Sequence, residues 1–170
     1  MVIYTDGACL GNPGPGGYGA ILLYGAHRVE HSQGFRRTTN NRMEIMAAIA
    51  GLEALREKCH VTLYSDSEYL VKAISQGWAK RWRAKGWMRN PKEAALNPDL
   101  WERLLQQCER HQVEFQWVRG HAGNHENERC DQLATQAAAQ PDLLVDGGYE
   151  SAPLGSTGRR PHWDSRPHAL

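Results

Sequence analysis

The chain has 170 residues, with 20 lysines and arginines, 19 aspartates and glutamates, and a formal net charge of +1. Its 41% hydrophobic and 23% charged residues exclude a globally disordered chain and indicate one globular domain with its own core. The start, MVIYTDG, has no basic region or small-residue cleavage site, and no stretch reaches membrane-spanning length, so we expect neither a signal peptide nor a membrane partner.

The first third of the sequence predicts an antiparallel meander. Residues 2–5, 18–24 and 28–35 are β-prone runs; an Asp-Gly pair ends the first run, and Gly25 separates the other two. A helix is predicted over residues 42–58, because apolar side chains recur there at helical spacing. This apolar stripe consists of Ile45, Ala48, Ile49, Leu52 and Leu55.

Helices and strands alternate in the remaining sequence. Strand patterns occupy residues 61–65 and 113–118, and helical patterns occupy residues 67–75, 78–83, 98–111 and 126–139. Three strands followed by this alternation predict an α/β protein with a mixed sheet flanked by helices. After residue 140 the sequence becomes rich in Pro, Gly, Ser and Arg without a sustained period. We therefore predict a folded domain over residues 1–140 and a flexible tail over residues 141–170.

Four acidic residues are candidates for a shared site: Asp6 and Asp66 close predicted strands, Glu44 lies in the first turn of the long helix, and Asp131 lies inside the last helix. Singly, each has an ordinary explanation as a turn residue, a helix-capping residue or a solvent-exposed acid. Together, carboxylates at the ends of adjacent central strands can converge with acids on the helices beside them. Such a cluster repels itself unless hard cations such as Mg²⁺ or Mn²⁺ neutralise it. Two ions about 4 Å apart would suit an in-line phosphodiester displacement.

Four segments resemble bacterial ribonuclease HI of the type 1 ribonuclease H family: YTDGACLGNPGPGGYGAIL, TTNNRMEIMAAIAGLEAL, YSDSEYL and VRGHAGNHENERCDQLA. The resemblance implies the ribonuclease H-like fold, a five-stranded mixed sheet of order 3-2-1-4-5 with helices on both faces. It implies an endonuclease that hydrolyses the RNA strand of an RNA/DNA hybrid and leaves 5′-phosphate and 3′-hydroxyl ends. It also implies that Asp6, Glu44, Asp66 and Asp131 are catalytic metal ligands for two Mg²⁺ ions bound with substrate, with Mn²⁺ as a substitute.

His121, in the GHAG segment, matches the mobile histidine of the family, which is thought to assist proton transfer or product release. Without the surrounding motif, a solvent-exposed loop histidine would be the ordinary interpretation. A zinc site made by His121, His125 and Cys130 is disfavoured, because structural zinc needs a fourth ligand and none is nearby in the sequence.

Residues 72–92 contain seven lysines and arginines, three tryptophans and no acid. This segment predicts sequence-independent contact with phosphates, although a solvated helix face is the ordinary alternative. The spacing of Trp78 and Trp82 favours local packing over base stacking. Residues 76–92 resemble the basic handle of the cellular enzymes, with these candidate substrate-binding residues: Lys80, Arg81, Trp82, Arg83 and Lys85.

The resemblance also implies a hybrid-binding surface that includes Cys9, Asn12, Asn40 and Asn41, with Arg37 and Thr39 near the DNA strand. Turn formation by Asn12 and helix capping by Asn40 and Asn41 are the structural alternatives. One departure concerns Glu68, which stands where the family commonly has Gln, so the role of that Gln is not carried over.

Two competing functions remain open at this point. A resolvase or integrase core would also cluster carboxylates around two metals, and a noncatalytic hybrid-binding module would bind the same partner without cutting it. The four cysteines, Cys9, Cys59, Cys108 and Cys130, are widely spaced without a C-x-x-C pair, which favours reduced thiols. We expect a cytoplasmic monomer whose partner is an RNA/DNA hybrid.

Overall fold

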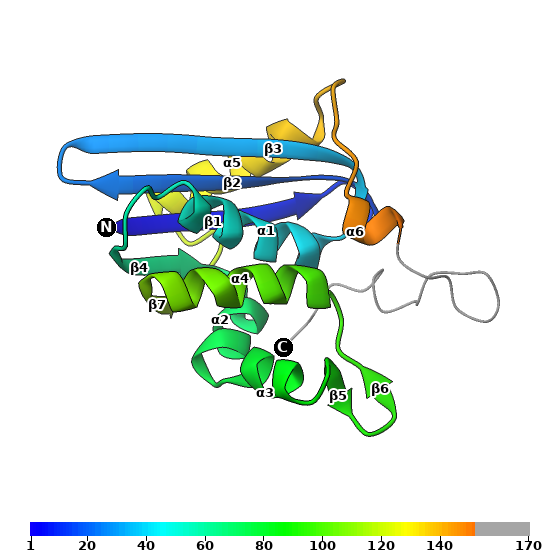
Figure 1. The fold of residues 1–170 in the computed structure, drawn as a ribbon. Coiled ribbons are helices and arrows are strands. Elements are labelled where there is room, and N and C mark those ends of the chain that lie inside the picture. Colours follow the sequence, from blue (N-terminus) through cyan, green and yellow to red (C-terminus); the bar gives the residue numbers. More distant parts are fainter. Residues whose placement is uncertain (152–170) are drawn as a thin grey trace.

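The computed structural model describes residues 1–151, so residues 152–170 of the predicted tail lie outside the described part of the chain. One five-stranded sheet of order β3-β2-β1-β4-β7 forms its centre (Figure 1). The strands β1 (Val2–Cys9), β2 (Gly14–Tyr24) and β3 (His27–Thr38) are antiparallel neighbours. Strand β4 (His60–Ser65) pairs in parallel with β1, and β7 (Gln112–Trp117) pairs in parallel with β4. The predicted mixed sheet and its order are therefore confirmed.

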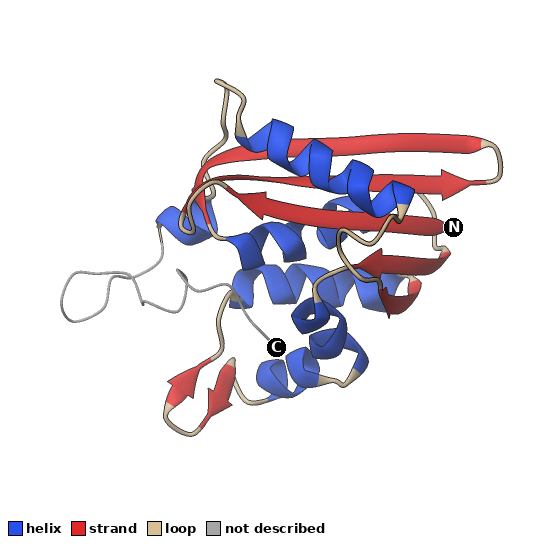
Figure 2. Ribbon diagram, turned by 180° about the vertical axis from the view of Figure 1, so that it is seen from behind, coloured by secondary structure: helices blue, strands red, loops and turns tan. Residues whose placement is uncertain are grey.

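Helices cover both faces of this sheet (Figure 2). Helix α1 (Asn40–Glu53) packs on β1 and β2 with α4 (Pro98–Arg110) beside it, and α5 (His125–Ala138) packs on the opposite face. The remaining elements are α2 (Glu68–Ser75), α3 (Trp78–Ala84), a hairpin of β5 (Met88–Asn90) and β6 (Glu93–Ala94), and α6 (Gly147–Glu150). The sequence pattern predicts neither the hairpin nor α6. In the described chain, no helix combines the length and the apolar character needed to cross a membrane.

The main core lies between α1, α4 and the sheet. The predicted apolar stripe is buried there, although α1 ends at Glu53 and Leu55 follows the helix. Trp101 of α4 is fully buried among the same side chains. Trp82 of α3 lies with its ring centroid 6.0 Å from that of Trp101 and 6.4 Å from that of Tyr69. The rings of the basic segment therefore attach α3 to the core, as the spacing of the tryptophans favoured.

Helix α5 approaches the other face very closely, because glycines lie beneath it. A Cβ atom added to Gly19 would lie 2.5 Å from the carbonyl oxygen of Cys130, and one added to Gly17 or Gly34 would collide with the carbonyl of Ala134 or Ala137. Helix backbone thus rests on strand backbone along β2 and β3. This contact sets the depth at which the side chains of α5 reach the end of β1.

The packed structure continues beyond residue 140, the predicted end of the domain. The Leu144 amide donates to the Gly34 carbonyl at 3.0 Å, and the Arg36 amide donates to the Leu144 carbonyl at 2.8 Å. Buried Asp146 accepts hydrogen bonds from Arg42 Nε at 2.7 Å and from Thr38 Oγ1 at 2.7 Å. The domain therefore includes α6, which is held by these contacts of the preceding residues, by the burial of Tyr149 and by an ion pair of Glu150 with Arg36 at 3.0 Å.

Candidate active site

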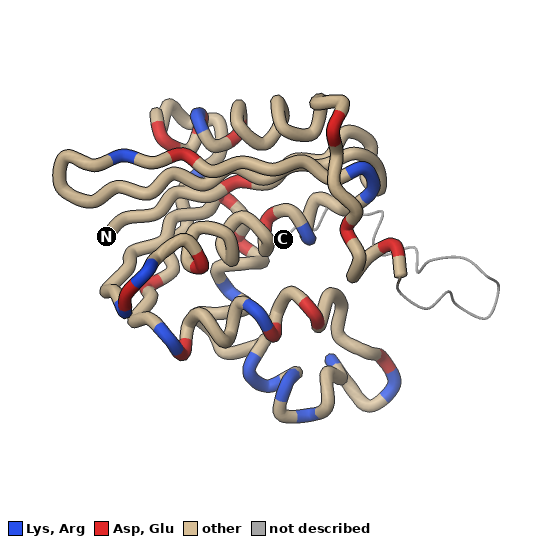
Figure 3. The backbone as a smooth tube through the Cα atoms, turned by 45° about the horizontal axis from the view of Figure 1, so that its top comes forward, with Lys and Arg blue, Asp and Glu red and all other residues tan. Residues whose placement is uncertain are grey.

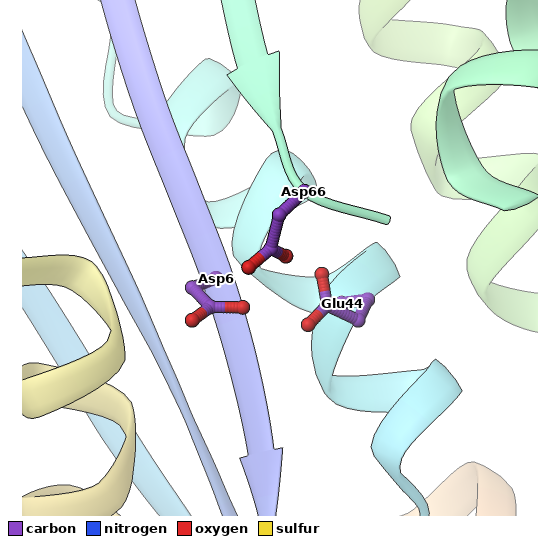
Figure 4. Close-up of side chains that lie close together, drawn as sticks. All are labelled: Asp6, Glu44 and Asp66. Carbon is purple, nitrogen blue, oxygen red and sulfur yellow. The ribbon is translucent and has the colours of Figure 1, made fainter. Parts of the chain in front are cut away.

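Three of the predicted acids meet at one end of the sheet (Figure 4). Thr5 of β1 pairs with Ser65 of β4, so the next residues, Asp6 and Asp66, leave that pair side by side. Glu44 projects toward them from α1. One carboxylate oxygen from each residue lies within 4.8 Å of the other two. The predicted convergence of Asp6, Glu44 and Asp66 is thus present, although β1 continues past Asp6 to Cys9 instead of ending there.

Gly7 allows Glu44 to come this close. A Cβ atom at position 7 would collide with the α1 backbone at Met43 and Glu44, so only glycine lets the helix lie against β1. The Gly7 amide donates to Glu44 Oε1 at 3.0 Å and to Asp6 Oδ1 at 2.9 Å. From the sequence alone, the Asp-Gly pair is an ordinary turn signal. In the structure its glycine positions two of the acids.

The protein makes this cluster electrostatically unfavourable for bare carboxylates. Burial, followed by the charges of Glu44 and Asp66, raises the pKa of Asp6 well above its ordinary value. Burial raises the pKa of Glu44 to about 8. Glu44 Oε2 is buried and has no hydrogen-bond partner among the described residues. An unpartnered buried oxygen among three carboxylates fits a hard divalent cation, whose preferred ligands are oxygens.

A cleft of about 420 Å³ opens above these acids. Asp131 of α5 and His121 of the loop before α5 also line it. His121 has a left-handed backbone with φ of 55°, and its side chain is exposed. The structure therefore brings all five predicted catalytic residues to one cleft.

Two further residues fix Asp66, and the sequence alone does not identify them. The Trp117 indole Nε1 donates to the Asp66 carbonyl at 3.1 Å. A Cβ atom at Gly120 would lie 2.7 Å from Asp66 Oδ2, so the loop after β7 passes directly against this carboxylate. The GHAG segment contains that glycine, but nothing in its spacing indicates the contact.

The residues expected to bind substrate have different surroundings. Asn40, Asn41 and Cys9 line the cleft. Asn12 Oδ1 accepts a hydrogen bond from the Asn40 amide at 3.0 Å, so Asn12 contacts the first residue of α1. Arg37 is exposed near the end of β3. Thr39 Oγ1 accepts a hydrogen bond from the Arg42 amide. Cys9 Sγ lies within hydrogen-bond distance of three carbonyl oxygens, and its single S–H can donate to one of them at a time: those of Gly11, Gly14 and Thr38.

The basic handle extends away from the sheet as α3 and the β5–β6 hairpin. In Figure 3, basic positions gather along this protruding part of the chain. Lys80, Arg81 and Lys85 are exposed and form no ion pair within the described residues. Arg83 instead pairs with Glu109 of α4 at 2.7 Å. The charges of these three candidate cations are therefore not neutralised by an acid of the described chain, although Arg81 Nη1 donates to the Gln76 carbonyl at 2.9 Å. Arg83 holds the handle to α4.

Comparison with known proteins decides the family. The sequence model of RNase H matches residues 1–139. The chain belongs to the RNase H family. It is 69% identical over 149 residues to the ribonuclease H of Syntrophus aciditrophicus, covering 88% of this chain and 86% of that one. It is 61% identical over 150 residues to the ribonuclease HI of Synechocystis, covering 88% and 94% of the two chains. The resemblance to this family is thus confirmed, and as one of its members the chain is a hydrolase.

Solved structures agree with this result. LC9-RNase H1, described as a type 1 RNase H with the type 2 active-site motif, is 32% identical with a TM-score of 0.71, over 94% of this chain and 84% of that one. LC11-RNase H1, solved in complex with an RNA/DNA hybrid, is 26% identical with a TM-score of 0.60, over 81% and 95% of the two chains. The ribonuclease H-like fold is therefore shown.

Proposed function

We propose that the chain is an endonuclease that hydrolyses the RNA strand of RNA/DNA hybrids by a two-metal-ion mechanism, leaving 5′-phosphate and 3′-hydroxyl ends. The observation that carries this proposal is the meeting of Asp6, Glu44 and Asp66 in one cleft, with Asp131 on its wall. Family membership and the hybrid bound by LC11-RNase H1 support the choice of substrate.

The four acids would hold two Mg²⁺ ions when substrate is present, with Asp6 and Asp66 as the central ligands and Glu44 and Asp131 completing the two sites. When bound, such ions lower the pKa of water and stabilise the charge on a leaving oxygen. Gly7 and Trp117 keep the central acids in place through their hydrogen bonds. Mn²⁺ shares the preference for oxygen ligands and would substitute for Mg²⁺.

His121 is the proposed proton carrier. It sits at the edge of the cleft in an exposed loop, so it can reach both the reacting phosphate and solvent. In this role it would protonate the leaving oxygen or assist departure of the product.

Binding of the hybrid would combine two kinds of contact. Cations of the handle would neutralise phosphates, giving salt-dependent and sequence-independent affinity. Cys9, Asn40 and Asn41 would face the sugars and base edges, where 2′-hydroxyls distinguish RNA from DNA. Exposed Arg37 would contact the backbone of the DNA strand, and Asn12 and buried Thr39 would support this surface through their hydrogen bonds at the start of α1. We further propose a cytoplasmic monomer; all four cysteines are free thiols in the structure.

The test is a cleavage assay on a uniform RNA/DNA hybrid labelled on each strand in turn. Single-stranded RNA, an RNA duplex and a DNA duplex serve as controls, each with Mg²⁺, with Mn²⁺ and with chelator. The proposal expects cleavage of the RNA strand of the hybrid alone, and only with metal. Cleavage of DNA would favour a resolvase-like nuclease, and hybrid binding without metal-dependent cleavage would favour a noncatalytic module.

A further inference from the structure

Glu68 is an acid in the cleft to which the proposed metal chemistry gives no role. It is the first residue of α2, directly after the N-cap Ser67, and it lines the cleft together with Asn40 and Asn41. Among the described residues, the acids close enough to share an ion are Asp6, Glu44 and Asp66, so Glu68 stands outside that set. Its place on the wall suggests contact with substrate.

An ion pair orients the Glu68 side chain along α2. Lys72 Nζ lies 3.3 Å from Glu68 Oε2, one helical turn further on, and the Glu68 side chain is 31% exposed. Within the described part of the chain, no side chain forms an ion pair with Glu68 Oε1. This oxygen can therefore accept a hydrogen bond from a ligand in the cleft. A carboxylate accepts hydrogen bonds without donating them, whereas the amides of Asn40 and Asn41 can do both. Glu68 is therefore a selective contact, satisfied by hydrogen-bond donors alone.

The minor groove of a hybrid offers few such donors. In A-form helices this groove is wide and shallow and displays base edges and 2′-hydroxyls. Its base edges carry acceptors, adenine N3 and pyrimidine O2, and guanine adds the 2-amino group as the one base donor. Facing an acceptor, Glu68 would lose water without gaining a partner; facing a guanine amino group, it would gain a charge-assisted hydrogen bond.

We propose that Glu68 determines specificity by favouring hybrids with a guanine at one fixed position in the minor groove beside the cut, where its carboxylate accepts from the 2-amino group. This inference rests on the proposed function, because it requires a hybrid in the cleft. Contact with a 2′-hydroxyl would satisfy the same oxygen, but every ribonucleotide has that group, so it would produce no preference among bases.

The experiment maps cut positions in hybrids of randomised sequence and then replaces guanosine by inosine at the preferred position. Inosine pairs with cytosine but lacks the 2-amino group. Because Glu68 is partly hydrated, we expect kcat/KM to fall by roughly three- to tenfold with inosine, the range for one groove contact in competition with water. In Glu68→Gln the two hybrids should be cut at nearly equal rates, since an amide can also donate to acceptors.

Glu53→Gln is the matched control. Glu53 ends α1 and pairs with Arg103 at 2.7 Å, so this variant also removes one carboxylate from a surface ion pair, at a site that does not line the cleft. It should keep the guanine preference of the parent. Equal cutting of guanosine and inosine hybrids by the parent would overturn the inference. So would a preference that persists unchanged in Glu68→Gln.

Failure of the proposed function has a different signature, which is that the parent cuts no hybrid at all. The inference is then decided by equilibrium binding of the guanosine and inosine hybrids to the full chain. Tighter binding of the guanosine hybrid by the parent, but not by Glu68→Gln, would support the groove contact. Equal affinities would overturn it.

Discussion

Asp6 and Glu44 are 4% and 5% exposed. Burying ionised carboxylates beside a third acid costs free energy of folding. Gly7 donates to one oxygen of each, and Glu44 Oε2 has no hydrogen-bond partner in the described chain. Packing and backbone contacts at Gly7 therefore hold an arrangement that charge alone would push apart. A bound cation would relieve this repulsion, so removing one charge should affect stability and turnover in opposite directions.

Asp6→Asn tests this at the level of one residue. We expect turnover of a hybrid to fall by at least about a hundredfold, because the variant lacks a group that stabilises the transition state. The hybrid dissociation constant should change little, and the metal-free variant should unfold at the same temperature as the parent or a higher one. Single-turnover cleavage, a binding titration and thermal unfolding in chelator measure the three quantities. Unchanged cleavage would refute the proposed role of Asp6.

The sequence identifies these acids because strand ends and helix starts are visible in its periodicity. It does not identify the contacts that position them. An Asp-Gly pair looks the same whether its glycine makes a turn or, like Gly7, admits a helix backbone. Trp117 and Gly120 act on Asp66 through tertiary contacts between segments far apart in sequence. Such contacts have no local pattern.

At the scale of elements, the position of Asp131 depends on how closely α5 lies on β2. Gly19 faces Asp6 in the pairing of β1 with β2, and it also lies beneath Cys130, the residue before Asp131. Gly34 lies beneath Ala137, near the other end of the same helix. The two glycines support α5 in the same way at different distances from the acids.

Gly19→Ala should therefore lower both the free energy of unfolding and the affinity of the enzyme for Mg²⁺. The destabilisation is expected to be about 1–3 kcal/mol, because the added methyl group forces the helix outward. Gly34→Ala is the matched control, with comparable destabilisation and a Mg²⁺ midpoint for cleavage like that of the parent. Denaturant unfolding and Mg²⁺ titrations of initial rates measure the two effects. Identical Mg²⁺ midpoints in both variants would contradict the positioning of Asp131 by Gly19.

The handle provides a second prediction at this scale. Replacing Lys80, Arg81 and Lys85 together by Gln should raise KM and flatten its salt dependence, by about one unit of log–log slope for each phosphate that is no longer neutralised. Arg83→Gln is the comparison, because Arg83 already pairs with Glu109 and should contribute less to binding than the three exposed cations. KM is measured across a range of salt concentrations. An unchanged slope in the triple variant would remove the handle from the binding surface.

Most elements are predictable because they are long and periodic. The five strands of the sheet and the helices α1 to α5 all correspond to predicted runs, with ends that differ by a few residues. The start of α1 is one such difference: the helix begins at Asn40, because Thr39 serves as its N-cap. The β5–β6 hairpin and α6 are too short to produce a period, and they form where neighbouring structure supports them.

At the scale of the whole molecule, one buried guanidinium joins distant parts of the chain. Arg42 of α1 pairs with Asp99 at the start of α4 and with Asp146 before α6, each at 2.7 Å. Its hydrogen bonds outweigh the burial of Asp99 and lower the pKa of that carboxyl. The Arg42–Asp146 pair joins residues 104 positions apart, so it produces no periodic pattern in the sequence near residue 146. For this reason the sequence pattern places the end of the domain at residue 140.

The acids of the molecule thus fall into two groups with opposite effects on pH dependence. Two acids have lowered pKa values: Asp99, and Glu30, whose pKa is lowered to about 2 by hydrogen bonds first from Arg129 and then from Arg28. Their ionised forms stabilise the folded state above about pH 4–5, and this stabilisation is lost as the pH falls. Asp6 and Glu44 have raised pKa values, so they contribute fully to the free energy of unfolding only at a pH below the ordinary pKa of a carboxyl group. This contribution is lost as the pH rises. For Glu44 this loss extends from about 4.5 to about 8.

The metal-free protein should consequently become less stable from pH 5 to pH 8, and the stabilisation by saturating Mg²⁺ should grow over the same interval, because cations compete with protons for the same oxygens. Thermal unfolding with chelator and with Mg²⁺ at each pH measures both trends. Glu44→Gln should make the metal-free decline shallower, since its amide does not titrate, whereas Glu57→Gln, which changes an exposed acid outside the cleft, should not. A Mg²⁺-induced shift in Tm that is equal at pH 5 and pH 8 would mean that the buried acids do not bind the ion.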